Sequence, residues 1–540
     1  MAHKEEELGS TTAKSIFPVL LVLHALVFLH TPQVDGARIL GLFASPAPSH
    51  NMMFQALMKA LAEGGHVVEV ASPCPLPTAP HKNYKDIKLP VPDFDRGTLL
   101  KMLISPDHGP VKEHIILWSV SKVLCETHLA SPELQKYLSQ DPGSFNFDLI
   151  VVEVFFYDCL IGFHHRFNVP VIAMASQFSL PWVYDLVGNP HSYSHVPHIL
   201  LPYGENMNFF ERLHNAIFSL GVTFARRWLA MPPQNEIAQK YIGSEMPPLW
   251  ELERNISLVF TNGHPATSPI HPLMPNMIEV AGMHISEKPP PLPKELQKLM
   301  DAHSRVILFS FGSIIVSDTI PRDRLETLLV SFKKLDVTII WKWDGDVDEL
   351  PLPLPSHVHI FKWLPQQSLL AHHNMAGFVT HGGLLSLQEA TYYGIPVIGF
   401  PFFGDQFMNL RHITDVGMGQ TLNFHSFTSD DLVMSVQDIL HNASYWNTAK
   451  KQSAIFRDQP ETPLQRGIYW TEYVIRHKGA PHLRSAAMDL NWLQYQLIDV
   501  IAFVLFVAGM ILGIIYYAFI TLVTLLSSKK TIEKREKKIK

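Results

Sequence analysis

"FVTHGGLLSLQEATYYGIPVIGFPFFGDQ", residues 378–406, has the pattern of a strand, a glycine turn, a helix, a second strand and an acid-amide pair. The apolar strand delivers His381 to its carboxyl end, and Gly382 and Gly383 let the backbone pass close to a ligand before the helix begins. Because a helix N-terminus offers unpaired N–H groups and a positive dipole end, a diphosphate fits this turn. The stretch therefore predicts a parallel α/β sheet that binds a ligand at its carboxyl edge.

The same alternation of strand and helix extends in both directions from this stretch. The predicted strands in the second half are residues 305–313, 337–343, 358–364, 376–382 and 396–401. Those in the first half are residues 38–43, 66–70, 147–156 and 169–176. Residues 50–63 predict a helix with Phe54, Leu57, Met58 and Leu61 on one stripe. We therefore expect two doubly wound α/β domains.

A proline-rich break, "SEKPPPLP" at 286–293, has the composition of a semi-rigid linker. It divides the chain into a predicted N-terminal domain at 38–285 and a C-terminal domain at 294–490. Two facing doubly wound domains surround one cleft with the carboxyl ends of their strands, where ligands bind in open α/β folds. No G-x-G-x-x-G follows the first strand, which disfavours a dinucleotide oxidoreductase.

Composition narrows the class of protein. The chain has 540 residues, of which 47% are hydrophobic and 17% charged, so it can bury substantial cores. A formal net charge of -6, with no basic stripe among aromatic residues, excludes nucleic acid as the expected partner.

Both ends of the chain are typical of targeting segments. The apolar run 16–29 predicts a signal peptide over 1–37, and the uncharged run 500–526 exceeds the roughly 20 residues that cross a bilayer. The tail 527–540 carries seven Lys or Arg against two Glu, which predicts a cytosolic tail and a type I, single-pass topology. The terminal "KKIK" resembles a dilysine retrieval signal, so we expect a lumenal body at the endoplasmic-reticulum membrane.

Two glycosylation sequons, at Asn255 and Asn442, fit a lumenal body. The three cysteines are Cys74, Cys125 and Cys159. Their spacing indicates neither a zinc site nor a disulfide framework, and the odd count leaves a free thiol or an intermolecular partner. No metal site is predicted.

Further polar residues surround the opening stretch. The indole of Trp363 can stack on a base and the amide of Gln366 can pair with its edge. The carboxylate of Glu389 can accept two ribose hydroxyls, and Asp405 with Gln406 can bind the hydroxyls of a sugar. Residues that could contact a base, a ribose, a diphosphate and a hexose thus follow one another along the sequence.

This series resembles the signature of the UDP-glycosyltransferase family, and the likeness is greatest to its insect branch. The matching positions are Trp363, Pro365, Gln366, Thr380, His381, Gly382, Gly383, Glu389, Asp405 and Gln406. The resemblance extends over nearly the whole chain and implies a GT-B fold, with the acceptor in the N-terminal domain and the UDP-sugar in the C-terminal one. Many members have Asn where this chain has Leu385, and Ser386 or Ser313 is available to compensate.

His50 is the predicted general base, since it follows the first strand at the amino end of the first helix. Its acidic partner is left open between Glu153, which the family match favours, and Asp158. His381, the neighbouring amides and Gly312-Ser313 are expected to stabilise the leaving diphosphate. Attack from the face opposite UDP would invert the anomeric centre.

We expect no cofactor beyond the UDP-sugar co-substrate, for which glucose is favoured over glucuronic acid. A glucuronate carboxylate would need a cation, and Arg411, the nearest base to the acid-amide pair, is expected to face elsewhere. The expected acceptor is a small lipophilic alcohol or phenol, and the bilayer is a further partner. Self-association into a homo-oligomer is left open. The alternatives are a ceramide-type lipid galactosyltransferase and a catalytically silent binding protein of the same fold.

Overall fold

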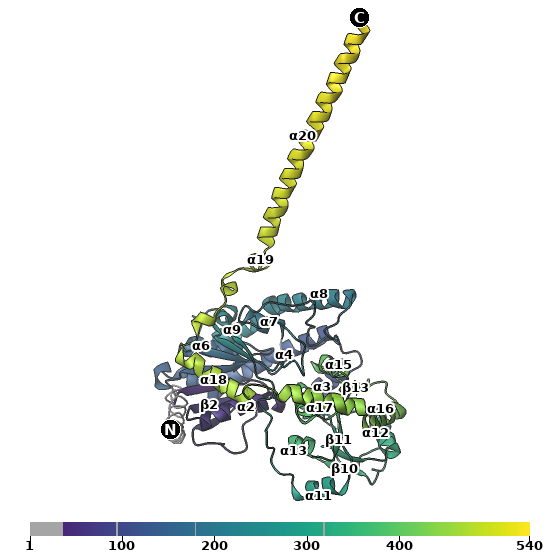
Figure 1. Cartoon of the computed structure of the whole chain (residues 1–540). Helices are drawn as coiled ribbons and strands as arrows, with labels where there is room; N and C mark the ends of the chain where they lie inside the picture. The colour runs from purple at the N-terminus through teal and green to yellow at the C-terminus, as the bar shows by residue number, and fades with distance from the viewer. Residues whose placement is uncertain (1–35, 93–95, 179, 317–318, 540) are drawn as a thin grey trace, which may run out of the picture. The chain divides into compact units, whose positions relative to one another are not determined.

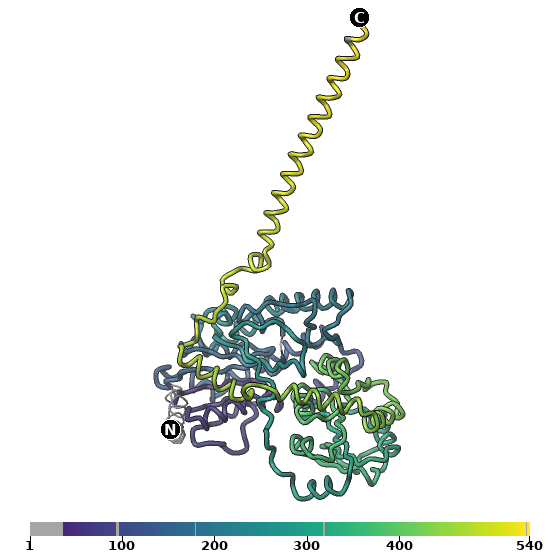
Figure 2. Tube along the Cα trace, in the orientation of Figure 1, coloured from purple at the N-terminus to yellow at the C-terminus, as the bar shows by residue number. Residues whose placement is uncertain are grey.

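The structure is a computed structural model that describes residues 36–92, 96–178, 180–316 and 319–539. Apart from Gly36 and Ala37, the predicted signal peptide lies outside the described residues. Two compact units divide the chain, residues 1–483 and 484–540. The first unit, the body, contains two parallel sheets with helices on their faces (Figures 1 and 2).

The first sheet has seven parallel strands in the order β3-β2-β1-β4-β5-β6-β7. They are β1 (Arg38–Leu42), β2 (Val67–Ser72), β3 (Tyr84–Lys88), β4 (Leu149–Glu153), β5 (Val171–Met174), β6 (Leu258–Thr261) and β7 (Met277–Glu279). The α-helices of this half are α2 (Pro48–Glu63), α3 (Arg96–Ile104), α4 (Pro110–Leu129), α5 (Pro132–Ser139), α6 (Gly162–Phe167), α7 (Pro181–Asp185), α8 (Phe209–Ala225), α9 (Met231–Ile242) and α10 (Leu249–Leu252). Its other helical turns are η1 (Pro142–Ser144), η2 (Cys159–Ile161), η3 (Arg226–Ala230) and η4 (Glu253–Asn255).

The second sheet has six parallel strands in the order β10-β9-β8-β11-β12-β13. They are β8 (Val306–Ser310), β9 (Thr338–Lys342), β10 (Val358–Phe361), β11 (Met375–Thr380), β12 (Val397–Gly399) and β13 (Gly419–Thr421). The helices that follow β7 are α11 (Lys294–Ala302), α12 (Arg322–Lys334), α13 (Gln366–Leu370), α14 (Leu384–Tyr393), α15 (Gln406–Asp415), α16 (Ser429–His441), α17 (Ala443–Arg457) and α18 (Pro463–Arg476). The body ends with η6 (Pro481–Leu483).

The nine strands predicted from apolar runs are confirmed, and so is the doubly wound class of both halves. Central strands such as β4 and β11 are buried along their whole length, which is why they read as continuous apolar runs. The predicted stripe of the first helix is also confirmed, because Phe54, Leu57 and Met58 of α2 are fully buried against the first sheet.

The order of the strands locates a crevice in each sheet. Chain order reverses between β1 and β4 in the first sheet and between β8 and β11 in the second. Neighbouring loops leave such a switch point in opposite directions, and ligands bind in the crevice that this opens at the carboxyl ends of the strands. The residues that follow these four strands are therefore the first candidates for a site.

Two segments connect the halves. The predicted linker 286–293 contains neither helix nor strand, and it is tied to the second half by Gln367, whose side chain accepts from Ser286 N–H at 3.0 Å. Helix α18 falls within the stretch 294–490 that was predicted as the C-terminal domain, yet it packs against α2 of the first half. The exact domain boundaries stay a prediction.

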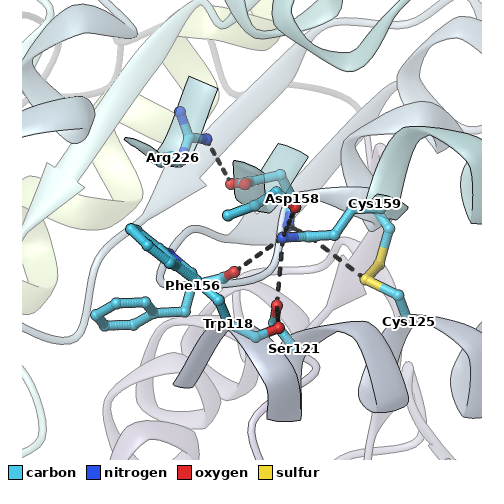
Figure 3. The surroundings of a disulfide bond; sticks show 9 residues. Trp118, Ser121, Cys125, Phe156, Asp158, Cys159 and Arg226 are labelled. Atoms are coloured by element: carbon cyan, nitrogen blue, oxygen red, sulfur yellow. Dashed lines mark hydrogen bonds and ion pairs between the residues drawn. A yellow bond between two sulfur atoms is a disulfide. The ribbon is translucent and has the colours of Figure 1, made fainter. Parts of the chain in front are cut away.

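Cys125 in α4 and Cys159 in η2 form a disulfide, with their Cα atoms 5.9 Å apart (Figure 3). The expectation drawn from cysteine spacing, that there is no disulfide framework, is therefore wrong for this pair. The two residues are 34 positions apart, and tertiary packing brings them together. Cys74 lies outside this bond, and its thiol donates to the carbonyl of Pro46 at 3.6 Å.

The second unit contains η7 (Ala486–Asp489), α19 (Trp492–Tyr495) and α20 (Ile498–Ile539). Helix α20 has a mean hydropathy of 2.8 over 18 residues and is the one helix among the described residues that is long and apolar enough to cross a membrane. It includes the predicted span 500–526 and continues through the basic tail.

Candidate active site

His50 and Glu153 meet at the switch point of the first sheet. His50 lies in the first turn of α2, directly beyond β1, and Glu153 is the last residue of the neighbouring strand β4. Glu153 Oε1 is 2.9 Å from His50 Nδ1, and the carboxylate is buried while the imidazole side chain is 15% exposed. With Nδ1 engaged, Nε2 is the ring nitrogen that can exchange a proton with a ligand.

Backbone and hydroxyl groups fix this pair. The N–H of Ser45, in the loop after β1, donates to Glu153 Oε2 at 2.9 Å, so both carboxylate oxygens are engaged. Ser176 Oγ lies 3.0 Å from His50 Nδ1. Sequence analysis missed Ser176, although its place two residues beyond β5, which pairs with β4, could have indicated it.

Asp158, the alternative partner for His50, is engaged elsewhere. Its carboxylate is buried and pairs with Arg226 at 2.8 Å (Figure 3). Arg226 also pairs with Glu253. Burial lowers the pKa of Arg226, but the two carboxylates outweigh this and raise it. Of the two acidic residues left open by the sequence, Glu153 contacts His50 and Asp158 belongs to a buried ion cluster.

At the second switch point, the His381 ring is held between two glycines. Gly312 follows β8 and has φ +79°, and a Cβ placed there would lie 2.6 Å from His381 Cε1. A Cβ at Gly383 would lie 2.6 Å from His381 Nε2. Because no side chain could occupy either position without moving the ring, both glycines are needed to seat His381. Ser313 is exposed beside this turn.

Burial, together with the charge of Lys342, lowers the pKa of His381 to about 4, so this imidazole is neutral near pH 7. Lys342, the last residue of β9, donates to the carbonyl of Gly312 and is the nearby cation. Burial lowers the pKa of Lys342 as well, against the attraction of Asp344. Sequence analysis missed Lys342, although it ends a strand next to β8.

The predicted nucleoside residues lie around the start of α14. Trp363 is 74% exposed, so its indole face is open to a planar ligand. Glu389 is buried and accepts from Gln366 Nε2 at 2.7 Å and from Gln367 Nε2 at 3.0 Å. Gln366 also donates to Ser386 Oγ at 3.1 Å. The side-chain N–H groups of Gln366 therefore donate to two residues of α14 in this structure, whereas the sequence predicted that they pair with the edge of a base.

Asp405 and Gln406 begin α15, beyond β12. Burial raises the pKa of Asp405 to about 6, although a hydrogen bond from Asn409 opposes the shift. Asn409 also donates to the carbonyl of Gly382 at 3.1 Å, linking the acid-amide pair to the His-Gly-Gly turn. Gln406 Oε1 accepts from Phe402 N–H at 2.8 Å. Asn409 was missed, although it lies four residues after Asp405 and thus on the same helix face.

The two halves meet at these residues. His50 and Glu113 are the ionisable groups that act on Asp405, and Glu113 Oε1 lies 3.8 Å from the Cβ position of Gly404. Glu113, in the first turn of α4, is buried and pairs with His108 at 2.8 Å. His50 and Asp405, which follow strands of the two sheets, are therefore near enough for their charges to interact.

Two buried amides also connect the halves. Gln388 of α14 donates to Asn262 Oδ1 at 3.0 Å, and Asn262 in turn donates to the carbonyl of Ser176 at 2.9 Å. Both amide side chains are fully buried. The helix that carries Glu389 is therefore linked by hydrogen bonds to the residue beside His50.

The prediction of no metal site overlooked an acidic run, Asp344, Asp346 and Asp348, which follows β9. All three are exposed. Among the described residues, no group of three or more His, Cys, Asp or Glu could hold a metal ion. Catalysis without a metal remains a prediction.

Two facing doubly wound domains, with a candidate site between their carboxyl edges, define a GT-B glycosyltransferase. Solved structures share this fold. A UDP-glucosyltransferase from Polygonum tinctorium, in complex with 3,4-dichloroaniline, has a TM-score of 0.57 at 14% identity and covers 82% of this chain and 99% of its own. The glycosyltransferase VinC in complex with dTDP has a TM-score of 0.54 at 15% identity and covers 82% and 100%.

Residues 116–538 match the family model "UDP-glucoronosyl and UDP-glucosyl transferase". "UDP-glycosyltransferase UGT5" of Dactylopius coccus is 34% identical over 89% of this chain and 91% of its own length. "UDP-glucosyltransferase 2" of the same insect is 33% identical over 90% and 93%, and human "UDP-glucuronosyltransferase 2B10" is 30% identical over 75% of each chain. The chain belongs to the UDP-glycosyltransferase family and is an enzyme that transfers a sugar from a UDP-sugar to an acceptor.

Proposed function

We propose that this enzyme transfers glucose from UDP-glucose to a hydroxyl group of a small lipophilic acceptor, with inversion at the anomeric carbon. The observation that carries the proposal is the contact between His50 and the buried Glu153, at a place where the charge of His50 also acts on Asp405 of the other half. A base, an orienting carboxylate and a sugar-binding acid on opposite walls are what hydroxyl glycosylation requires.

His50 Nε2 accepts the proton of the acceptor hydroxyl as the acceptor oxygen attacks the anomeric carbon. The bond from that carbon to the diphosphate oxygen breaks, and UDP leaves from the opposite face. Glu153 and Ser176 fix the ring through Nδ1, and the carboxylate stabilises the imidazolium that forms. An α-linked donor therefore yields a β-glycoside.

UDP would bind to the second sheet. Trp363 is the stacking platform for the base. Glu389, whose carboxylate contacts Gln366, Gln367 and His284, would accept the ribose hydroxyls. The N–H groups at the start of α14, together with the neutral His381 and the Lys342 cation, would stabilise the charge that develops on the diphosphate.

The charges around the sugar position favour glucose over glucuronate. A carboxylate at the sixth carbon would enter a region that already contains Asp405 and Glu113. Arg411 pairs with Asp415 at 2.8 Å on an exposed part of α15. The printed names of the relatives include both a glucosyltransferase and a glucuronosyltransferase, so the names alone do not choose the donor.

Aromatic rings beside His50 favour an apolar acceptor. The His50 ring lies 5.1 Å from that of Phe155, which contacts Phe156 at 4.6 Å, and Phe156 contacts Trp182 at 5.3 Å. Phe156 and Trp182 are buried behind Phe155. Phe155 is half-buried and is therefore the ring that can contact an apolar acceptor whose hydroxyl faces the imidazole.

The proposed location is the endoplasmic-reticulum membrane, with α20 as the single span and the body in the lumen. The Cys125–Cys159 disulfide supports an oxidising compartment, and α20 is long and apolar enough to span. Asn255 and Asn442 are both exposed, as acceptors of N-glycans must be.

The experiment is a competition between UDP-glucose and UDP-glucuronic acid for one phenolic acceptor, with the product identified by mass and by NMR. We expect mostly glucoside, in the β configuration. A predominant glucuronide would refute the choice of donor, an α-glucoside would refute inversion, and absence of any transfer to free phenols or alcohols would favour the lipid galactosyltransferase alternative.

A further inference from the structure

Two buried amide side chains connect α14, whose start is the proposed diphosphate site, to the residue beside His50. Gln388, in the second turn of α14, donates from Nε2 to both oxygens of Asn262, at 3.0 Å to Oδ1 and at 3.1 Å to the carbonyl. Asn262 directly follows β6 and donates from Nδ2 to the carbonyl of Ser176 at 2.9 Å. Gln388 and Asn262 are fully buried, and Ser176 is 3% exposed. These three residues are called the amide bridge below.

The amide bridge fixes the main chain around Ser176. Asn262 also donates its main-chain N–H to the carbonyl of Gln177 at 3.0 Å, and the N–H of Ala175 donates to the carbonyl of Phe260 at 2.8 Å. The main chain on both sides of Ser176 is thus held by β6 and the residue after it. Because an unpaired buried amide costs free energy, each member of the bridge constrains the position of the next.

The near end of the amide bridge is a hydroxyl that contacts the proposed base. Ser176 Oγ lies 3.0 Å from His50 Nδ1, the same ring nitrogen that lies 2.9 Å from Glu153 Oε1. An ionised Glu153 already accepts the Nδ1 proton, so Ser176 contributes direction rather than charge. Two contacts to one ring nitrogen restrict the ring rotation that a single contact would allow. The direction in which His50 Nε2 points therefore depends on where Ser176 is held.

We propose that Gln388 is a positioning residue for the reaction, which acts on His50 through Asn262 and Ser176. This inference rests on the proposed function, in which His50 is the general base. Gln388 belongs to the second half of the body, directly before Glu389, whereas Asn262 and Ser176 follow strands of the first sheet. The base is therefore oriented from the half that would bind the donor.

The choice of acceptor separates this role from simple attachment of the two halves. An aliphatic alcohol must lose its proton as the glycosidic bond forms, so its transfer needs a well-placed base, whereas an ionised nitrophenol attacks without one. A displaced imidazole therefore slows transfer to the alcohol and spares transfer to the phenolate. A loosened interface between the halves would slow both transfers, because both need the same placement of donor and acceptor.

The test measures turnover of the full chain at a saturating donor concentration, with an aliphatic alcohol or with a nitrophenol at a pH where the phenol is ionised. Gln388→Met keeps the length of the side chain and removes both of its N–H groups. Gln420→Met is the matched control, since Gln420 of β13 also donates from Nε2 to two oxygens, those of Asp438 and Tyr445, at 2.6 and 2.8 Å. We expect Gln388→Met to lower turnover of the alcohol by about tenfold and that of the phenolate by about twofold or less. Gln420→Met should change neither.

A double-mutant cycle identifies the route by which Gln388 acts. Ser176→Ala should lower turnover of the alcohol by a similar factor to Gln388→Met. The double variant should be no slower than Ser176→Ala alone, because both changes remove the same contact with His50. Additive losses would show that Gln388 acts by another route and would overturn the inference.

The remaining outcomes distinguish failure of this inference from failure of the proposed function. Equal losses with alcohol and phenolate in Gln388→Met would show that the amide bridge only joins the two halves. Loss of UDP binding by Gln388→Met would assign the residue to the donor site instead. His50→Ala is the reference for the base, and unchanged turnover of the alcohol by this variant refutes the proposed function. A slow His50→Ala beside an unaffected Gln388→Met refutes the positioning role alone.

Discussion

The four acidic side chains considered for the site or near it differ in what they contact. Glu153 contacts His50, Asp158 contacts Arg226, and Glu113 pairs with His108. Asp405 has a hydrogen bond from Asn409 and a pKa raised to about 6 by burial. Of the four, Asp405 is the one whose ionisation we expect to govern binding of the donor sugar.

The first prediction concerns pH and the donor sugar. Ionised Asp405 accepts hydrogen bonds from sugar hydroxyls, and below pH 6 its carboxyl is mostly protonated. Raising the pH from 5 to 7 should therefore increase the affinity for UDP-glucose by about tenfold, in proportion to the ionised fraction of Asp405. Calorimetry with UDP-glucose measures this affinity. Asp405→Asn is the control and should make the affinity independent of pH. An affinity of the unmodified enzyme that does not change with pH would contradict the sugar-binding role.

The second prediction concerns discrimination between donors. Glu113→Gln removes one of the two negative charges near the sugar position. The ratio of glucuronide to glucoside in the competition assay should rise by roughly tenfold, the scale of one charge interaction of ~1.4 kcal/mol. Glu133→Gln, on the exposed part of α5, is the matched control and should leave the ratio unchanged. An equal effect of both variants would refute local repulsion.

Sequence patterns indicated candidate residues beyond strands but not the residues that contact them. His381 directly follows an apolar run, and His50 was indicated by its place at the amino end of the first helix and by the family resemblance. The catalytic roles of both stay predictions. Ser176, Lys342 and Asn409 act through neighbours that only the folded chain supplies. The choice between Glu153 and Asp158 likewise depends on Arg226, which is 68 residues beyond Asp158 and has no sequence signal that links the two.

At the scale of elements, nine strands were predicted, including the edge strand β10, whereas β3, β6, β7 and β13 were not. β4 and β11 are buried on both faces and read as apolar runs. β7 and β13 are three residues long and only partly buried, so their sequences carry little strand signal. Helix α8 was not among the predicted elements. Its exposed residues are largely apolar, and Asn215 and Ser219 face the core beside Phe218 and Val222, so the usual amphipathic pattern is absent.

The third prediction concerns the ion cluster that holds the end of α8. Arg226→Met leaves Asp158 and Glu253 buried without their cation, which should lower the free energy of unfolding by about 3–5 kcal/mol. Arg227→Met is the matched neighbour, and because Arg227 is only partly buried over Trp250, its loss should cost about 1 kcal/mol or less. Denaturant unfolding of the purified full chain compares them. Similar losses from both variants would show that the cluster does not stabilise the fold.

At the scale of the whole molecule, the fourth prediction concerns topology. If α20 is the single span and the body is lumenal, protease added to sealed microsomes should remove only the residues that follow the span. Asn255→Gln and Asn442→Gln should each remove one glycan, seen as a mobility shift. Detergent is the control, since it should expose the body to the protease. Digestion of the body in sealed vesicles would overturn the proposed orientation.

The GT-B fold joins these scales, because it brings the switch points of two sheets to one cleft. Glu153, the partner of His50, ends β4 and His381 follows β11, so the proposed base and the proposed diphosphate site come from different sheets. The Gln388–Asn262–Ser176 connection links those sheets through buried hydrogen bonds. We therefore expect the catalytic base to act on the acceptor without contributing to UDP binding.

Comparison of turnover and UDP binding in His50→Ala tests this most directly. The account predicts that turnover with an unactivated alcohol falls by about a hundredfold or more, the usual scale for losing a general base. UDP affinity should change little, since the proposed UDP residues lie on the second sheet. Near-normal turnover of His50→Ala with that alcohol would contradict the proposed mechanism.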